Sequence, residues 1–319
     1  WLETTIASAL PDDADPSMIC VVSNPEFLRE GAAVHDFLHP DRVVIGGDCE
    51  ASVEKVACIY LPILEQTFEG GTPNQLPSLL TTGRTTAETI KYAANAFLAT
   101  KISFINEIAR ICEGLGADVT EVAEAIGLDS RIGPAFLDAG VGWGGSCFGK
   151  DTAALASMAR DRGIDPLILD AVREVNARQR DAVVTKLERH LNGIDGKRIA
   201  VLGLAFKPGT DDLRDAPAVT IAGSLLEQGA VVRACDPMVD HVPSLPDLEV
   251  FADPFEAIRD ADAALLITEW PELISLDFVK VAERMSGSTI IDGRNALDPA
   301  EVVGAGLVYE GVGRSTHSL

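Results

Sequence analysis

Residues 85–192 constrain the fold most, because they show no strand pattern although strands and helices alternate on both sides of them. Thr86 is expected to cap a first long helix in which apolar residues recur at spacings of three and four, beginning with Ile90, Ala94 and Phe97. Pro166 begins another long helix, which Asn192-Gly193 ends. Between them, residues 119–128 and 151–162 form shorter helices. The pattern predicts an all-helical middle domain.

The first part of the chain reads as the end of an α/β unit. An opening helix and the turn PDDADPS precede a short buried strand, Met18–Val22, and the loop SNPEFLREGAAVHDF follows it. A second strand, Arg42–Ile45, ends at a glycine pair, and a helix covers about Ala51–Leu64. We assign residues 1–84 to this unit, 85–192 to the helical domain and 193–319 to a third domain.

The third domain begins KRIAVLGLAFKPGTDDLRDAPAVTIAGSLLEQGAVVRACDP, which predicts strand, loop, helix and strand, with Asp236 just beyond the second strand. AALLIT and STIID supply further strands. This pattern is typical of a doubly wound, Rossmann-like α/β domain, in which ligands lie beyond the carboxyl ends of the strands. The loop Gly203–Gly209 lacks a G-x-G-x-x-G fingerprint, so a nucleotide site and a purely structural turn are both open.

Composition narrows the class of protein. A formal charge of −23, from 26 Lys and Arg against 49 Asp and Glu, disfavours nucleic acid and anionic membranes as partners. Neither a membrane span nor a signal peptide is evident, so we expect a protein of the reducing cytoplasm. The six cysteines form no C-x-x-C pair, hence neither a disulfide framework nor a zinc site, and no metal is expected. Most lie in apolar strings such as MICVV and VEKVACIYL, where cysteine acts as a small hydrophobe.

One cysteine differs from the others because it follows a run of glycines, in GVGWGGSCFGKD. If a helix begins at Cys147, its amide groups and dipole, together with the nearby Lys150, would lower the thiol pKa. Asp151 lies one helical turn on, where a carboxylate could handle protons after covalent attack. The alternatives are a mobile loop with an incidental thiol and an aspartate that only supports the first turn.

Two further pairs have helical spacing. Lys91 and Asn95 share a face of the first long helix among apolar neighbours, so the lysine needs a function or a carboxylate partner unless it extends to solvent. Glu26 and Glu30 lie in the loop after a strand, where two carboxylates could supply a general base and a charge for a lysine. A solvated acidic turn explains that pair equally well.

Five motifs in order carry a resemblance to a known family: SNPEFLREGAAVHDFLHPDRVVIGG, KYAANAFLATKISFINEIARIC, RIGPAFLDAGVGWGGSCFGKD, GLAFKPGTDDLRDAP and IIDGRN. The series resembles the UDP-glucose 6-dehydrogenases, within the wider UDP-glucose/GDP-mannose dehydrogenases. The resemblance implies a four-electron oxidation of UDP-glucose to UDP-glucuronate by two NAD⁺, with a cysteine thiohemiacetal and thioester as intermediates.

The resemblance also implies roles for particular residues. Cys147 matches the nucleophile, Lys91 and Asn95 the groups that stabilise the oxyanion, and Asp151 the group that handles protons, while Glu26 and Glu30 flank the reacting centre. Residues that match substrate contacts are Phe27, Leu28, Arg29, Lys91, Arg131, Phe136, Leu137, Gly142, Phe206 and Lys207. Residues that match cofactor contacts are Glu30, Lys150 and Arg214.

The family's Gly-rich NAD-binding turn has no counterpart in this sequence, so we expect that an amino-terminal segment is absent and that this chain alone does not turn over NAD. Arg131 matches an arginine that reaches a neighbouring subunit, which implies a homodimer or larger assembly. Three other readings stay open: a GDP-mannose 6-dehydrogenase, a two-electron β-hydroxyacid dehydrogenase with the same Lys-x-x-x-Asn helix, and a helical dimerisation core carrying a nucleotide-binding domain.

Overall fold

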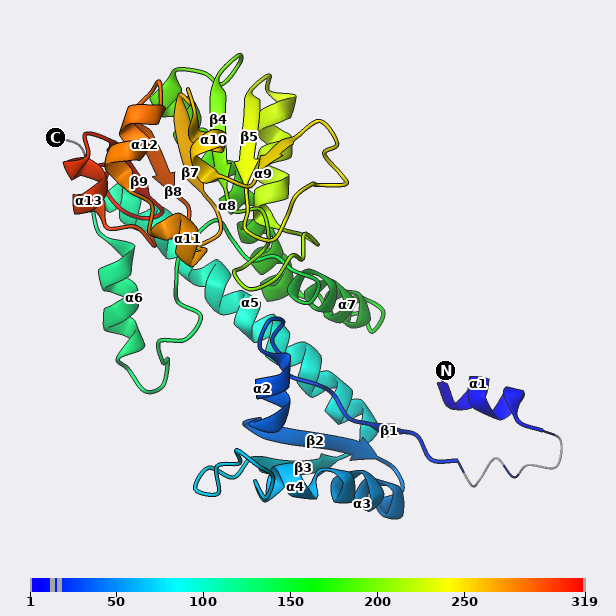
Figure 1. The fold of residues 1–319 in the computed structure, drawn as a ribbon. Coiled ribbons are helices and arrows are strands. Elements are labelled where there is room, and N and C mark those ends of the chain that lie inside the picture. Colours follow the sequence, from blue (N-terminus) through cyan, green and yellow to red (C-terminus); the bar gives the residue numbers. More distant parts are fainter. Residues whose placement is uncertain (1, 12–14, 16–18, 318–319) are drawn as a thin grey trace. The chain divides into compact units, whose positions relative to one another are not determined.

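The computed structural model describes residues 2–11, 15 and 19–317. The chain forms two compact units, unit 1 (Trp1–Ala94) and unit 2 (Asn95–Leu319). Helix α5 (Arg84–Leu115) begins in unit 1 and continues into unit 2 (Figure 1). The sequence-based bounds of three domains, 1–84, 85–192 and 193–319, remain a prediction.

Unit 1 is built on a three-stranded sheet. Its elements before α5 are α1 (Leu2–Ala9), β1 (Val22–Ser23), α2 (Ala33–Leu38), β2 (Arg42–Gly47), α3 (Glu50–Ile59), α4 (Leu61–Leu64) and β3 (Ser78–Thr82). The central strand β2 pairs antiparallel with β1 and parallel with β3. The apolar run Val43–Ile45 in β2 is buried, as expected for the middle strand of a sheet.

Several expectations for unit 1 need correction. Residues 16–18 lie outside the described residues, and the described strand, Val22–Ser23, is only half-buried. The predicted helix Ala51–Leu64 is two helices separated at Tyr60, because the nearby Pro62 cannot donate a backbone hydrogen bond. Strand β3 was not predicted.

Two local predictions about side chains were also wrong. Thr86 does not cap α5, which already begins at Arg84. Cys20 and Cys58, interpreted as small core hydrophobes, are exposed.

Unit 2 contains the predicted helical region and a Rossmann-like sheet. After α5 its elements are α6 (Val119–Gly127), α7 (Phe148–Arg160), α8 (Leu167–Leu191), β4 (Arg198–Leu202), α9 (Pro217–Glu227), β5 (Val231–Cys235), β6 (Glu249–Phe251), α10 (Pro254–Ile258), β7 (Ala263–Leu266), α11 (Pro271–Ile274), α12 (Phe278–Arg284), β8 (Thr289–Asp292), α13 (Pro299–Gly304) and β9 (Val308–Gly311). Residues 85–192, all of them described, contain no strand, which confirms that prediction. Asn192 has the left-handed conformation that ends α8.

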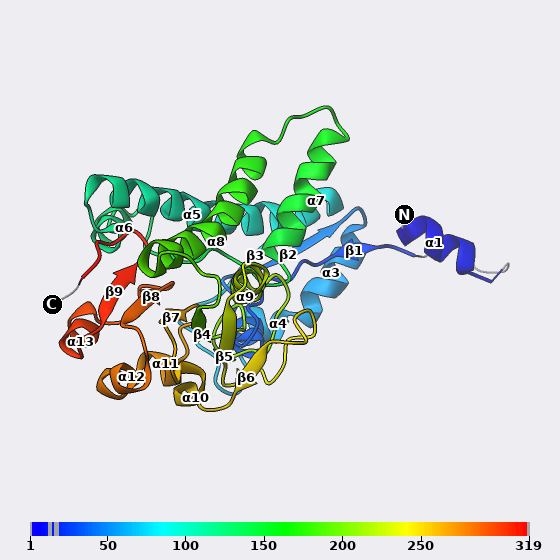
Figure 2. The ribbon, with the colours of Figure 1, turned by 90° about the horizontal axis from the view of Figure 1, so that it is seen from above.

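The six strands of unit 2 are all parallel, in the order β6-β5-β4-β7-β8-β9. This is the doubly wound order, in which the first strand of the domain lies beside the fourth. Helices α8 and α9 cover one face of the sheet, while α10, α12 and α13 cover the other (Figure 2). The doubly wound fold is therefore confirmed, although β6 and β9 were not predicted.

The helices and the sheet of unit 2 share one hydrophobic core. Ile105 of α5 and Leu187 of α8 are fully buried in the same cluster as Ile199 of β4 and Leu265 of β7. Full burial of such side chains is worth about 1.5–3 kcal/mol each. The carboxyl-terminal half of α5 and most of α8 are therefore fixed against the sheet.

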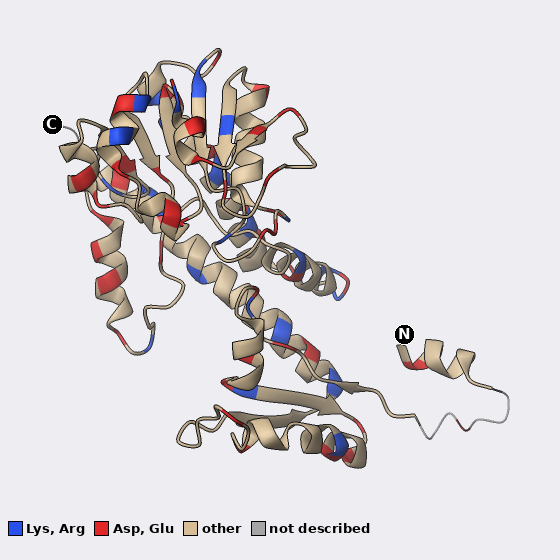
Figure 3. Ribbon diagram, in the orientation of Figure 1, with Lys and Arg blue, Asp and Glu red and all other residues tan. Residues whose placement is uncertain are grey.

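Acidic residues lie on elements of both units (Figure 3). Among the described residues, no helix combines the length and the apolar character that crossing a membrane requires. The same residues contain no group of three or more His, Cys, Asp or Glu side chains that could hold a metal ion.

Candidate functional site

The cysteine that the sequence singled out lies at the beginning of a helix. Cys147 is the N-cap residue of α7, and its thiol is exposed. It lies 3.6 Å (Sγ) from the hydroxyl oxygen of Ser146. The preceding segment Gly140–Ser146, here called the glycine loop, lies between α6 and α7. The expected helix start is therefore confirmed.

Buried amide side chains from two helices hold the glycine loop. Asn106 of α5 accepts a hydrogen bond from the backbone N–H of Gly140 at 2.8 Å, and Gln179 of α8 donates to the carbonyl of Gly140 at 2.8 Å. Asn176 of α8 both accepts from and donates to the backbone of Trp143, at 2.8 and 3.0 Å. Both backbone groups of two loop residues are thus bonded to side chains that are almost fully buried.

The glycines of the loop are required by close contacts within unit 2 itself. Gly142 has a φ of +100°, and a Cβ there would lie 2.6 Å from Oδ1 of Asn176. Gly145 has a φ of +82°, and a Cβ there would lie 2.8 Å from the ring of Phe206. Any larger residue would therefore displace either the Asn176 amide or the Phe206 ring.

A buried carboxylate follows the thiol by one turn of α7. Asp151 is 2% exposed, and its backbone N–H donates to the carbonyl of Cys147 at 2.9 Å. Its two oxygens accept hydrogen bonds from Nδ2 of Asn95 and from Nζ of Lys150, both at 2.6 Å. The structure thus brings Asn95, Lys150 and Asp151 together, with Cys147 on the preceding turn.

In unit 1, Lys91 has a carboxylate partner. Its Nζ lies 3.1 Å from Oε1 of Glu26, and the lysine side chain is only 18% exposed. The ammonium group also lies 5.5 Å from the ring centroid of Phe27, whose other cation contact is Arg42 at 4.0 Å. The prediction that Lys91 has a carboxylate partner is confirmed, and the alternative, in which the lysine extends to solvent, is wrong.

The remaining predicted residues of unit 1 follow Glu26 closely in sequence. Leu28 is exposed, and its backbone N–H donates to the Glu26 carboxylate at 2.7 Å. The Arg29 guanidinium forms two hydrogen bonds with Asp36, which lower the pKa of the Asp36 carboxyl to about 2. Glu30 is half-buried.

Among the predicted residues of unit 2, the cations lie at the surface. Arg131 is 87% exposed and is paired with Asp129, while the guanidinium of Arg214 forms two-point hydrogen bonds with Asp212. Nζ of Lys207 lies 5.4 Å from the ring centroid of Phe206.

Two predicted substrate contacts precede the glycine loop. Phe136 has a φ of +65°, and its ring meets that of Phe148 edge-on at 6.4 Å between centroids. Leu137 is 3% exposed and belongs to the hydrophobic core.

Helix α8 carries buried polar residues that were not predicted. Asn176, Gln179 and Arg180 are buried, and the Arg180 guanidinium donates to the carbonyl of Trp143 at 3.0 Å and pairs with Asp215 at 2.8 Å. Polar residues at spacings of three and four on a helix that also carries buried valines were the available signal.

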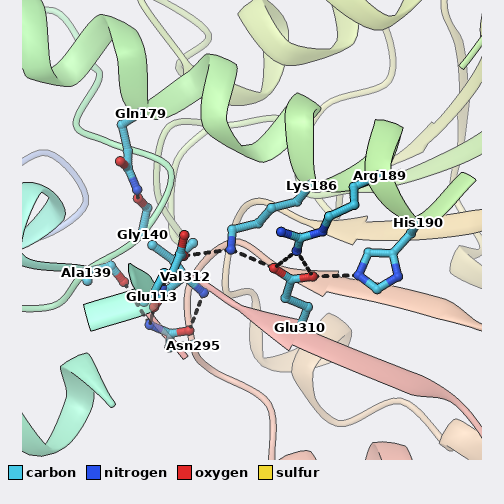
Figure 4. A network of polar contacts seen from close by, with 11 residues as sticks. Glu113, Ala139, Gly140, Gln179, Lys186, Arg189, His190, Asn295, Glu310 and Val312 are labelled. Atoms are coloured by element: carbon cyan, nitrogen blue, oxygen red, sulfur yellow. Dashed lines mark hydrogen bonds and ion pairs between the residues drawn. The ribbon is translucent and has the colours of Figure 1, made fainter. Parts of the chain in front are cut away.

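The same helix ends in a buried ion-pair network (Figure 4). The carboxylate of Glu310 on β9 is 3% exposed and lies 2.7 Å from Nζ of Lys186 and 2.5 Å from both the Arg189 guanidinium and the His190 ring. Glu113 of α5 also accepts from Lys186, at 2.6 Å. Burial alone would raise the pKa of Glu310, but these hydrogen bonds outweigh it and lower the pKa to about 2.

Three family models match successive parts of the chain. They are described as the NAD binding domain, the central domain and the UDP binding domain of the UDP-glucose/GDP-mannose dehydrogenase family, and they match residues 3–64, 85–178 and 200–299.

Individual relatives agree with these matches. A UDP-glucose 6-dehydrogenase of Bacillus subtilis is 46% identical over 92% of this chain and 62% of its own length, and one of Rhizobium meliloti is 46% identical over 93% and 67%. The solved structure of a UDP-glucose dehydrogenase from Pyrobaculum islandicum superposes with a TM-score of 0.79 at 38% identity, over 93% of this chain and 64% of that one. The chain thus spans about two thirds of the length of these relatives.

Proposed function

Because the chain belongs to the UDP-glucose/GDP-mannose dehydrogenase family, we propose that the protein is an NAD-dependent UDP-glucose 6-dehydrogenase that forms UDP-glucuronate. The observation that carries the proposal is the exposed thiol of Cys147, one helical turn before the buried Asp151. A nucleophile next to a carboxylate suits a reaction that must hold an aldehyde and then hydrolyse an acyl group.

NAD is the cofactor that the family implies, and when bound it accepts hydride. The described residues suit the outer contacts of NAD, which is an anion. The side chains of Lys150 and Arg214 are cations, and they are 67% and 69% exposed. They do not suit its diphosphate, because no strand-to-helix turn among the described residues carries a G-x-G-x-x-G sequence. We therefore assign Glu30, Lys150 and Arg214 to the outer contacts of NAD and propose that this chain alone does not form NADH.

The steps assigned to this chain begin at an aldehyde produced from the C6 alcohol of the sugar. The Cys147 sulfur adds to the aldehyde carbon, and the carbonyl electron pair moves to oxygen. We assign stabilisation of that oxygen to the Lys91 ammonium and to the Asn95 amide, which has a second hydrogen besides the one donated to Asp151. Transfer of the remaining hydride of that carbon to NAD⁺, which would accept it when bound, would convert the thiohemiacetal anion to a thioester.

Hydrolysis then returns the thiol. Water attacks the thioester carbon, the carbon–sulfur bond breaks, and the water gives up its proton to Asp151. Asn95 and Lys150 fix the orientation of that carboxylate through two hydrogen bonds of 2.6 Å. In unit 1, Glu26 keeps the Lys91 ammonium in place at 3.1 Å.

Substrate contacts are assigned within each unit separately. The glycine loop with Phe136 and Leu137, and the pair Phe206–Lys207 within the matched UDP-binding region, would hold the UDP moiety. The rings and amide groups of these segments suit a uracil base and a diphosphate. The sugar contacts are assigned to Phe27, Leu28 and Arg29.

We also propose a homodimer or larger assembly. Phe97, Phe104 and Ile111 of α5 are 65%, 49% and 50% exposed, and their spacing of seven places them on one stripe of the helix. Such a stripe suits burial against a second copy. Phe104→Glu should shift the sedimentation coefficient of the protein to that of the monomer, whereas an unchanged coefficient would contradict the assignment.

Product stoichiometry tests the enzyme proposal. The full-length protein should form two NADH per UDP-glucose and much less with GDP-mannose, and Cys147→Ser should abolish UDP-glucuronate formation. One NADH per sugar, together with normal turnover by the serine variant, would instead indicate a two-electron dehydrogenase. Ser157→Ala on the same helix α7 is a matched control that should retain activity.

A further inference from the structure

Two cysteines of unit 1 lie just beyond the first strand pair, Cys20 before β1 and Cys49 after β2. Strand β1 is antiparallel to β2, with Val22 opposite Gly47 and Ser23 opposite Gly46. The paired residues end there, and continuing the same register for two residues leads to Cys20 on one side and Cys49 on the other. The backbone of Cys49 is extended, with φ −117° and ψ 110°, and the Cys20 side chain is one of the groups that lower the pKa of Cys49, which indicates that the two thiols are close.

This register suits a disulfide bond. Residues directly opposite in an antiparallel pair have Cα atoms about 4.5–5.5 Å apart, and disulfides span Cα separations of about 4.4–6.8 Å. Both side chains of an opposite pair also point to the same face of the sheet. Bond formation would therefore need little movement of the backbone.

The surroundings of Cys49 favour its thiolate. Its sulfur accepts a hydrogen bond from the Ser52 hydroxyl at 3.4 Å, at the N-terminus of the ten-residue helix α3. This hydroxyl, followed by backbone N–H groups of α3, lowers the pKa of Cys49 to about 7. By contrast, burial raises the pKa of Cys235 to about 12.

The cysteines also differ in their exposure to solvent. Cys20 is exposed and Cys49 half-buried, so a small oxidant can reach both. Cys58 on α3 is exposed as well and serves as a thiol of the same unit for comparison. Cys112 and Cys235 are buried in unit 2.

We propose that Cys20 and Cys49 form a peroxide-reactive dithiol that closes reversibly to a disulfide. The Cys49 thiolate attacks hydrogen peroxide, the O–O bond breaks, and a sulfenic acid and hydroxide form. The Cys20 thiol then attacks the sulfenic sulfur, an S–S bond forms, and water leaves. The two sulfurs together lose two electrons, and the peroxide is reduced to two waters.

The site is separate from the proposed dehydrogenase chemistry, because neither thiol has a role in it. The disulfide would close a segment that contains Phe27, Leu28 and Arg29, to which we assigned sugar contacts. Oxidation would therefore restrict that segment without altering Cys147.

Peptide mapping of the full-length protein tests the proposal. After hydrogen peroxide and alkylation of the remaining thiols, a cross-linked peptide containing positions 20 and 49 should appear and should vanish on treatment with dithiothreitol. At neutral pH, Cys49 should be oxidised faster than Cys58, because the Ser52 hydroxyl and the backbone N–H groups of α3 stabilise the Cys49 thiolate.

Two variants separate the steps. In Cys20→Ser, Cys49 should accumulate as a sulfenic acid that dimedone traps, and oxidation of UDP-glucose by the untreated variant should be unchanged. In Cys49→Ser, Cys20 should stay reduced. Oxidation of Cys58 as fast as Cys49, or no cross-link although Cys49 is consumed, would overturn the proposal, and neither result would affect the assignment of Cys147.

Discussion

Replacement of Glu310 by glutamine should destabilise unit 2 more than replacement of an exposed charged residue by a neutral one. The carboxylate is 3% exposed and has three cationic or potentially cationic partners on α8, namely Lys186, Arg189 and His190. The glutamine variant keeps the shape of the side chain but leaves the Lys186 ammonium, 7% exposed, with Glu113 as its remaining carboxylate. Breaking a buried ion pair on one side costs about 3–5 kcal/mol.

The pKa of Glu310 gives a second value for the stability that this carboxylate contributes. Its ordinary value is 4.5 and its folded value about 2. At about 1.4 kcal/mol for each tenfold change in acidity, this difference corresponds to about 3 kcal/mol of stability at neutral pH. Because the folded pKa is depressed, this contribution is complete above pH 4.5 and is lost as the pH falls toward 2, with about 2 kcal/mol lost by pH 3.

Urea unfolding followed by tryptophan fluorescence measures both effects, since Trp143 and Trp270 are buried in unit 2. At pH 7, Glu310→Gln should lower the free energy of unfolding by about 3 kcal/mol or more, and by pH 3 the gap to the unmodified protein should narrow by about 2 kcal/mol. The exposed pair Glu174–Arg178 supplies the control, and Glu174→Gln should cost less than about 0.5 kcal/mol.

The double variant Lys186→Met, Glu310→Gln separates the loss of attraction from the cost of the buried cation. It should recover part of the stability that Glu310→Gln loses, because no ammonium group is then left in the core. A loss below about 1 kcal/mol at pH 7, or a gap that does not change with acid, would refute the reasoning.

Other substitutions test the packing around the glycine loop and the sheet. Asn176→Ala removes both bonds to the Trp143 backbone and leaves its buried N–H without that acceptor, so the free energy of unfolding should fall by about 2 kcal/mol in urea titrations. Gly203→Ala places a Cβ 2.4 Å from that of Thr268 at a φ of +90° and should lower the melting temperature by several degrees or prevent folding. Gly209→Ala, at a φ of +80° with no atom within 4 Å, should have a smaller effect in the same melts, and equal effects would contradict the steric argument.

Sequence patterns predicted those parts of the fold that depend on local periodicity and termination. The long helices follow from apolar spacing, and the end of α8 follows from Asn192, which adopts the left-handed conformation. Strand β3 was not predicted. Most of its side chains are exposed, so its sequence shows no alternation of apolar and polar residues.

For the candidate site, the sequence located Cys147 and Asp151 on one helix, since four residues make about one turn. It suggested that Glu26 or Glu30 supplies a charge for a lysine but could not name Lys91 as that lysine, because Glu26 is far away along the chain and only the tertiary fold brings the two charges to 3.1 Å. The buried amides Asn106 and Asn176 were missed for the same reason. Their role depends on backbone groups of a loop whose path local periodicity does not predict.

Helix α8 connects the glycine loop to the edge strand β9. Its Asn176 holds the glycine loop, and its Arg189 binds the edge strand β9 at a distance of about 20 Å along the helix axis. A helix is stiff over this length, so a tilt imposed at the sheet would also displace the backbone that leads to Cys147. Amide hydrogen exchange in the loop and in β9 should then speed up together when either anchor is weakened, as expected for one cooperative unit.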